Sequence, residues 1–252
     1  MTDRPLVIVI TGASRGLGAG MAKAFKKKGY KLGLCSRSSS VSYDIASDNI
    51  HYQPVDVCNA EALQDFLDAV VAKFGDIDMW INNAGILGPI QPIRNTNFAD
   101  FNKNIQINLG GVFHGSKAYI QHVRSSQMKD ATLINISSGA AVAGYAGWGA
   151  YCSSKGAVDR LTECAFLEEK EATGKPNFRA YSIAPGVIDT DMQAMIRSTP
   201  KERFPMLEKF QELKRNENFN SPEYVSAKIE ELALLKGPQT LPVVQRIPNE
   251  KK

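Results

Sequence analysis

The segment GWGAYCSSKGAV, at residues 147–158, places a phenol and an ammonium group four positions apart. Such positions share one face of a helix, so Tyr151 and Lys155 would project into the same space. The cation would lower the pKa of the phenol from its ordinary value of roughly 10, and the phenol could then protonate a carbonyl oxygen. Ser138, which ends the preceding apolar run, offers a hydroxyl to hold that oxygen. The same spacing occurs in plain surface pairs, but the small neighbouring residues favour chemistry because they leave room for a cofactor and a ligand.

A glycine-rich segment near the N-terminus suits the binding of a pyrophosphate. TGASRGLG, at residues 11–18, directly follows an apolar run and opens a segment with helical spacing. Gly12 permits a tight turn, Gly16 lets the backbone approach the pyrophosphate, and Gly18 allows close contact between helix and sheet. The first helical turn would then offer free N–H groups to anionic oxygens. We expect dinucleotide contacts from Gly12, Ser14, Arg15, Gly16, Leu17 and Gly18.

The residues that follow the second expected strand favour a phosphorylated dinucleotide. NAD-preferring sites often place an acidic residue here, on the adenosine ribose. This chain has Ser36 and Arg37 instead, and Arg15 in the glycine turn is a second cation. Two guanidinium groups would bind a 2′-phosphate through charge-assisted hydrogen bonds. We therefore expect NADP(H); the alternative is that both arginines are ordinary surface residues.

The segment NNAG, at residues 82–85, ends another apolar run in polar and very small residues. Open parallel sheets bind ligands beyond the carboxyl ends of their strands. Asn83, Ala84 and Gly85 would let the backbone pass close to a cofactor ribose. By itself the pattern is equally typical of a simple turn.

Short apolar segments alternate with helical ones along most of the chain. We expect strands at residues 6–10, 30–36, 51–57, 77–85, 131–138 and 178–186, and helices at 19–29, 59–75, 98–124 and 150–173, with Asn59 capping the second helix. This alternation predicts an α/β fold: a single doubly wound Rossmann domain over residues 1–252, with a parallel sheet of about seven strands and helices on both faces. The polar, methionine-rich stretch 187–224 is expected to form a substrate flap. Pro242 and Pro248 shorten any last strand in VVQRI.

Composition narrows the class of protein. The chain has 252 residues, of which 43% are hydrophobic and 22% charged, and its formal net charge is +4. Aromatic residues do not interleave with the basic ones, which argues against nucleic-acid binding. The four cysteines have no metal-ligand or CxxC spacing and suit a reducing compartment. With no apolar run of transmembrane length, we expect a cytoplasmic protein that binds neither a metal nor a membrane.

Taken together, these residues resemble the classical short-chain dehydrogenase/reductase family over nearly the whole chain, because residues 11–18, 82–85, Ser138, Tyr151, Lys155 and 185–186 fall in the family's order. The resemblance implies that Tyr151 is the acid/base and that Ser138 orients the substrate carbonyl. Lys155 would bind the nicotinamide ribose beside Tyr151, and Asn108 would anchor a water that links Lys155 to solvent. The implied further cofactor contacts are Asp56, Val57, Pro185, Gly186, Val187, Ile188, Thr190 and Met192.

Within this family, the chain is similar to the sepiapterin reductase and benzil reductase branch in GWGAYCSSK and in YSIAPGVIDTDMQ, at residues 181–193. This implies NADPH-dependent reduction of a ketone or vicinal diketone, with Trp148 and Met192 lining the substrate site beside Ser138 and Tyr151; the alternative for Trp148 is a packed core edge. Sepiapterin reductases hold the pterin amino group with an acid near the C-terminus. Glu250, the only late acid here, is no clear counterpart.

The family resemblance leaves other activities open. A 3-oxoacyl or sugar reductase would share the fold and the catalytic residues, because function depends on the site rather than on the fold. A non-enzymatic redox sensor would need only the glycine turn, whereas this chain also has the catalytic set. The family usually pairs through helices equivalent to 98–124 and 150–173, so we expect a homodimer. We also expect the protein to bind a small carbonyl compound as its substrate.

Overall fold

The computed structural model describes residues 4–41, 43–172 and 177–251, and one parallel sheet runs through them. Its strands are β1 (Val7–Thr11), β2 (Lys31–Ser36), β3 (Ile50–Pro54), β4 (Met79–Asn82), β5 (Asp130–Ile136), β6 (Asn177–Ala184) and β7 (Val244–Arg246). They lie in the order β3-β2-β1-β4-β5-β6-β7. The strand order reverses between β1 and β4, and ligands bind at such a point in open α/β sheets. The predicted doubly wound fold is confirmed.

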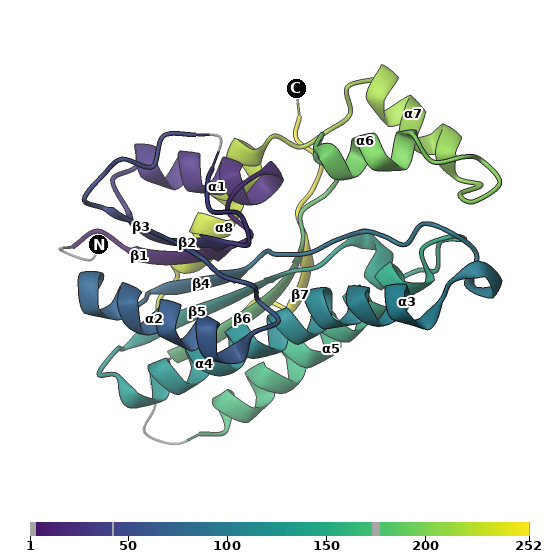
Figure 1. The fold of residues 1–252 in the computed structure, drawn as a ribbon. Coiled ribbons are helices and arrows are strands. Elements are labelled where there is room, and N and C mark those ends of the chain that lie inside the picture. The colour runs from purple at the N-terminus through teal and green to yellow at the C-terminus, as the bar shows by residue number, and fades with distance from the viewer. Residues whose placement is uncertain (1–3, 42, 173–176, 252) are drawn as a thin grey trace.

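Helices cover both faces of this sheet (Figure 1). One layer contains α1 (Gly16–Lys27) and α8 (Pro222–Ala233), and the other contains α2 (Ala60–Phe74), α4 (Gly111–Ser125) and α5 (Gly149–Lys170). Successive side chains of a strand point to opposite faces. Ile8 of β1 therefore packs in the α1–α8 core, while Val7 and Val9 pack in the core formed with α2 and α4. Burial on both faces explains why β1 is continuously apolar.

The expected helix at 98–124 is not one regular helix. It consists of α3 (Phe98–Ile105), a π-helical turn (Gln106–Gly110) and α4. Nothing in the local sequence pattern marks that turn. The expected second helix is present as α2, and Asn59 caps it by accepting a hydrogen bond from the Ala62 N–H at 3.0 Å. The expected helix at 150–173 is α5, and its last expected residue lies outside the described part of the chain.

The stretch 187–224 leaves the sheet and contains α6 (Asp191–Arg197), α7 (Leu207–Arg215) and the first turn of α8. Figure 1 shows α6 and α7 beyond the carboxyl edge of the sheet, where the predicted site residues lie. β7 has only three residues, as the flanking prolines predicted. No helix in the described part of the chain combines the length and apolar character that a bilayer crossing requires.

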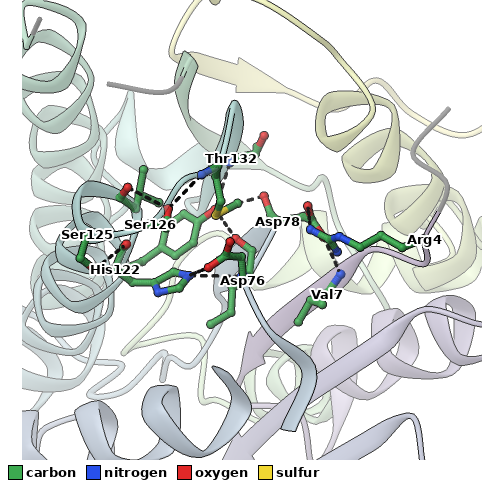
Figure 2. A network of polar contacts seen from close by, with 12 residues as sticks. Arg4, Val7, Asp76, Asp78, His122, Ser125, Ser126 and Thr132 are labelled. Atoms are coloured by element: carbon green, nitrogen blue, oxygen red, sulfur yellow. Dashed lines mark hydrogen bonds and ion pairs between the residues drawn. The ribbon is translucent and has the colours of Figure 1, made fainter. Parts of the chain in front are cut away.

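A polar network closes the opposite, amino edge of the sheet (Figure 2). Asp78 accepts hydrogen bonds from Arg4 at 2.7 and 2.9 Å and from the Val7 N–H at 2.8 Å. His122 Nε2 accepts a hydrogen bond from the Ile77 N–H at 3.2 Å, which requires a neutral imidazole. Burial lowers the pKa of His122, and the charge of Asp76 partly opposes this effect.

This geometry predicts a specific loss of stability in acid. The unfolded chain takes up a proton on His122 below pH ~6.5, whereas the folded chain resists protonation until lower pH. The stabilising contribution is therefore complete above that pH and is lost as pH falls below it. We expect His122→Gln, whose amide can accept the same N–H without titrating, to reduce the fall in the free energy of unfolding between pH 7.5 and 5.5. Urea denaturation of both proteins measures this, and parallel pH profiles would contradict it.

Candidate active site

The predicted site residues come together at the carboxyl edge of the sheet. Most of them follow a strand: β1 (Gly12, Ser14, Arg15, Gly16, Leu17, Gly18), β2 (Arg37), β3 (Asp56, Val57), β4 (Asn83, Ala84, Gly85), β5 (Ser138) or β6 (Pro185, Gly186, Val187, Ile188, Thr190, Met192). Asn108 lies in the π-helical turn, Trp148 is the N-cap of α5, and Tyr151 and Lys155 lie in the first two turns of that helix. Ser36 is the last residue of β2 itself. Parallel strands bring these separate segments to one edge, where open sheets bind their ligands.

The glycine turn has the close backbone packing that was expected of it. Gly12 has φ +67, and a Cβ there would lie 2.7 Å from Ala84 Cα. A Cβ at Gly18 would overlap the Gly12 carbonyl oxygen. α1 begins at Gly16 without a side-chain cap or an acidic residue in its first turn. The backbone and the helix end therefore fit a bound pyrophosphate.

Thr11 joins the glycine turn to the segment after β4, a role that the sequence did not reveal. Its hydroxyl accepts hydrogen bonds from the Asn83 N–H at 3.0 Å and the Ala84 N–H at 3.1 Å. Asn83 Nδ2 donates in return to the Thr11 carbonyl oxygen at 2.9 Å. These contacts fix the two segments that would lie on either side of a dinucleotide.

The π-helical turn holds Asn108 against the same segment. Its Oδ1 accepts from the Ile86 N–H at 2.8 Å, and its Nδ2 donates to the Ile86 carbonyl oxygen at 2.8 Å. The same Nδ2 also lies 2.9 Å from Asn104 Oδ1 and 3.1 Å from Ser154 Oγ. The sequence did not indicate Asn104 and Ser154, because no local pattern pairs them with Asn108. A Cβ on Gly85 would lie 3.1 Å from Asn108 Oδ1 and 3.7 Å from Lys155 Nζ, so a small residue is needed beside the ammonium group.

Tyr151, Ser138 and Lys155 occupy one small space. Lys155 Nζ lies 5.8 Å from the centroid of the Tyr151 ring. We expected a lowered phenol pKa, but burial raises the pKa of Tyr151, and a hydrogen bond from Ser138 only partly lowers it. The Ser138 hydroxyl oxygen also accepts from the Ala140 N–H at 3.1 Å, so its proton is free for the phenol. The phenol is therefore protonated at neutral pH, as a proton donor must be.

Lys155 is only 5% exposed. It donates a hydrogen bond to the Ile136 carbonyl oxygen at 2.7 Å. Burial lowers the pKa of Lys155 to about 8, and the charge of Asp159 partly opposes this effect. Lys155 thus remains a cation at pH 7, close to the phenol and to Gly85.

The adenosine end of the predicted cofactor site carries exposed cations. Arg37 follows β2 directly, and Arg15 pairs with Asp191 of α6 at 3.6 Å. Burial and the neighbouring Asp56 raise the pKa of the Cys58 thiol, whereas the charge of Arg37 lowers it. The Arg37 guanidinium therefore lies close to the turn that follows β3. Both guanidinium groups are exposed to solvent beside the sites predicted to hold the ribose.

Two phenylalanines of the stretch 187–224 pack with Trp148 in an aromatic cluster beside Tyr151. The Trp148 indole contacts the Tyr151 ring edge-on, with centroids 5.7 Å apart, and stacks on Phe204 at 4.8 Å. Phe210 lies 5.3 Å from the same indole, and Met192 packs against this cluster. The sequence did not indicate Phe204 and Phe210, because no local pattern pairs them with Trp148. Trp148 is only 5% exposed and Phe204 is fully buried, so these rings form a packed apolar cluster beside Tyr151.

The buried charge of Lys155 predicts a distinctive pH dependence of stability. The depression of its pKa from 10.5 to about 8 corresponds to roughly 3 kcal/mol at pH 7. Between these values the unfolded chain binds more protons, so the free energy of unfolding rises with pH. We expect Lys155→Met to remove this rise, so that the difference in stability between variant and wild type changes by about 2 kcal/mol between pH 7 and 9.5. Urea titrations at both pH values measure it, and a constant difference would contradict it.

Comparisons with known proteins agree with this geometry. The family described as short chain dehydrogenase matches residues 6–201. A benzil reductase ((S)-benzoin forming) from Bacillus cereus is 33% identical over 233 residues, which cover 89% of this chain and 92% of that protein. The solved structure of the KRED1-Pglu enzyme has a TM-score of 0.81 and 29% identity, covering 96% of this chain and 100% of that one.

A second solved structure contains a cofactor. ElxO with NADP bound has a TM-score of 0.77 and 26% identity, and the match covers 97% of both chains. The family match spans most of the residues that carry the site, from the glycine turn to the segment after β6. The chain therefore belongs to the short-chain dehydrogenase family of oxidoreductases and resembles its benzil reductases.

Proposed function

We propose that this oxidoreductase is an NADPH-dependent carbonyl reductase that acts on ketones and vicinal diketones. The observation that carries the proposal is the convergence of Ser138, Tyr151 and Lys155 beside a backbone segment without side-chain bulk at Gly85. This set offers a protonated phenol, a hydroxyl and a cation in one buried space. The similarity to benzil reductases supports the choice of substrate class.

The residues would divide the reaction between them. The dinucleotide, when bound, supplies the hydride. Ser138 orients the carbonyl oxygen by a hydrogen bond, and Tyr151 gives that oxygen its proton. Lys155 binds the nicotinamide ribose and stabilises the phenolate that remains on Tyr151, since an opposite charge nearby favours the charged form. Asn108 fixes Ile86 and Ser154 around this set.

The aromatic cluster around Trp148 supports a substrate with apolar or aromatic flanks. Trp148 and Met192 would contact such groups beside Tyr151, with the buried Phe204 and Phe210 packed against the indole. Ring stacking of this kind adds about 0.5–1.5 kcal/mol beyond the burial of area. Benzil-like diketones fit this environment better than highly polar substrates.

A panel of carbonyl compounds tests the proposed activity. We expect rapid oxidation of NADPH, followed by its absorbance, with a 1,2-diketone and an isatin-like dione, and slower oxidation with sepiapterin and an acetoacetyl thioester. Tyr151→Phe is expected to lower turnover at least ~10³-fold while NADPH binds with nearly unchanged affinity, because only the transferable proton is removed. A high rate on the thioester alone would replace the proposal with a 3-oxoacyl reductase. Binding without turnover on any carbonyl would favour a redox sensor.

The cofactor preference has its own test. A charge-assisted contact to the 2′-phosphate contributes roughly 1.5–3 kcal/mol, so Arg37→Ala should narrow the preference for NADPH over NADH by about tenfold or more. The ratio of kcat/KM values for the two cofactors measures this. Arg94→Ala, which removes an exposed cation in the loop after β4, is a matched control. An unchanged ratio in Arg37→Ala would show that Arg37 is an ordinary surface residue.

A further inference from the structure

Asn220 lies just before α8 and connects three separate parts of the chain. It is only 4% exposed. Its Nδ2 donates to the Pro185 carbonyl oxygen at 2.9 Å and to the Pro248 carbonyl oxygen at 3.1 Å. Its Oδ1 accepts from the Glu250 N–H at 2.8 Å. Both amide protons and the amide oxygen are therefore used, which fixes the orientation of the side chain.

The segment after β6 is shaped around this side chain. The Asn220 N–H donates to the Val187 carbonyl oxygen at 2.8 Å, so Asn220 contacts the carbonyl groups on both sides of Gly186. Gly186 has φ +80, and a Cβ there would lie 2.5 Å from Asn220 Nδ2. A larger residue would be strained by its backbone conformation and would collide with the amide. Residues 185–187 thus depend on Asn220 for their conformation.

The C-terminal residues hold Asn220 in place from the other side. The Glu250 carboxylate accepts hydrogen bonds from the Ser221 N–H at 2.6 Å and the Ser221 hydroxyl at 3.0 Å. The Ile247 N–H donates to the Ala184 carbonyl oxygen at 3.0 Å. Figure 1 shows the end of the chain, in yellow, running beside the green segment that leads from β6 to α6. The last residues therefore lie alongside the segment that Asn220 shapes.

We propose that Asn220, fixed by Glu250, is a positioning residue for the nicotinamide end of the cofactor site. This inference rests on the proposed function, in which residues 185–188 pass beside the nicotinamide carboxamide. Loss of the amide donors would leave the Pro185 carbonyl oxygen without its buried partner and free the backbone at Gly186. The adenosine end, after β2, is held by other contacts, such as the hydrogen bond between the Ser36 and Tyr52 hydroxyls at 2.7 Å, so it should be unaffected.

Two ligands separate the two ends of the site. NADP⁺ occupies both ends, whereas 2′,5′-ADP has only the adenosine half with its phosphates. For Asn220→Asp and Glu250→Ala, we expect the NADP⁺ affinity measured by calorimetry to fall about tenfold, as loss of buried hydrogen bonds would do, while the 2′,5′-ADP affinity changes less than about twofold. Asn220→Asp keeps the size and the acceptor for Glu250 N–H but removes both donated hydrogen bonds.

Turnover gives a second readout. Misplacement of the nicotinamide should lower kcat as well as raise the KM for NADPH, because the hydride donor is no longer aligned. Glu250→Gln, which keeps the shape and an acceptor oxygen, should recover part of the loss seen in Glu250→Ala. Glu231→Ala removes another acidic residue, one that pairs with Lys228 on the surface of α8, and should behave as wild type.

The outcomes distinguish this inference from the proposed function. If Glu250→Ala and Asn220→Asp bind NADP⁺ as wild type does, or lose affinity for both ligands equally, the positioning role is wrong. If Asn220→Asp does not fold, the Glu250 variants decide alone, because Glu250 acts from the end of the chain. If the wild type binds neither ligand, the proposed function fails instead.

Discussion

A buried positive charge is the constraint on which the carboxyl edge of this sheet depends. An ammonium ion removed from water is costly unless polar groups replace its hydration. Lys155 meets this requirement through the Ile136 carbonyl oxygen at the end of β5 and through the charge of Asp159. Asp159 is itself held by the Ser182 hydroxyl of β6, at 2.6 Å. The position of the ammonium group thus ties α5 to β5 and β6.

The space around this charge follows from the same requirement. Gly85 has no side chain, and a Cβ there would approach both Asn108 and Lys155. The π-helical turn then places the Asn108 amide between Ile86 and Ser154, so one side chain joins the segment after β4 to α5. Such single π-helical turns within helices are frequent at functional sites. The site is therefore built from the backbone and small residues, with few side chains filling it.

The sequence predicts those features that depend on neighbouring residues. The strand, turn and helix around residues 11–18, the cap at Asn59 and the i, i+4 pair of Tyr151 and Lys155 are local, so their spacing was sufficient. The π-helical turn was not predictable, because regular helical spacing continues through it. The raised pKa of Tyr151 was also missed, because burial is a property of the fold and spacing shows only the nearby cation. Contacts such as Trp148 with Phe204 join residues far apart in the chain and leave no local pattern.

The hydrogen bonds of the Glu250 carboxylate bear on which substrates the site can select. Sepiapterin reductases hold the pterin amino group with an acid near the C-terminus, and Glu250 is the only late acid here. Its carboxylate accepts two hydrogen bonds from Ser221, so it is engaged within the protein. The neighbours of Tyr151 are instead apolar rings, with Phe204 fully buried against Trp148. Under the proposed function, selection among carbonyl compounds would depend on how their flanking groups fit these rings. Diketones with aromatic flanks meet that condition, because they need only an apolar surface on each side of the reacting carbonyl.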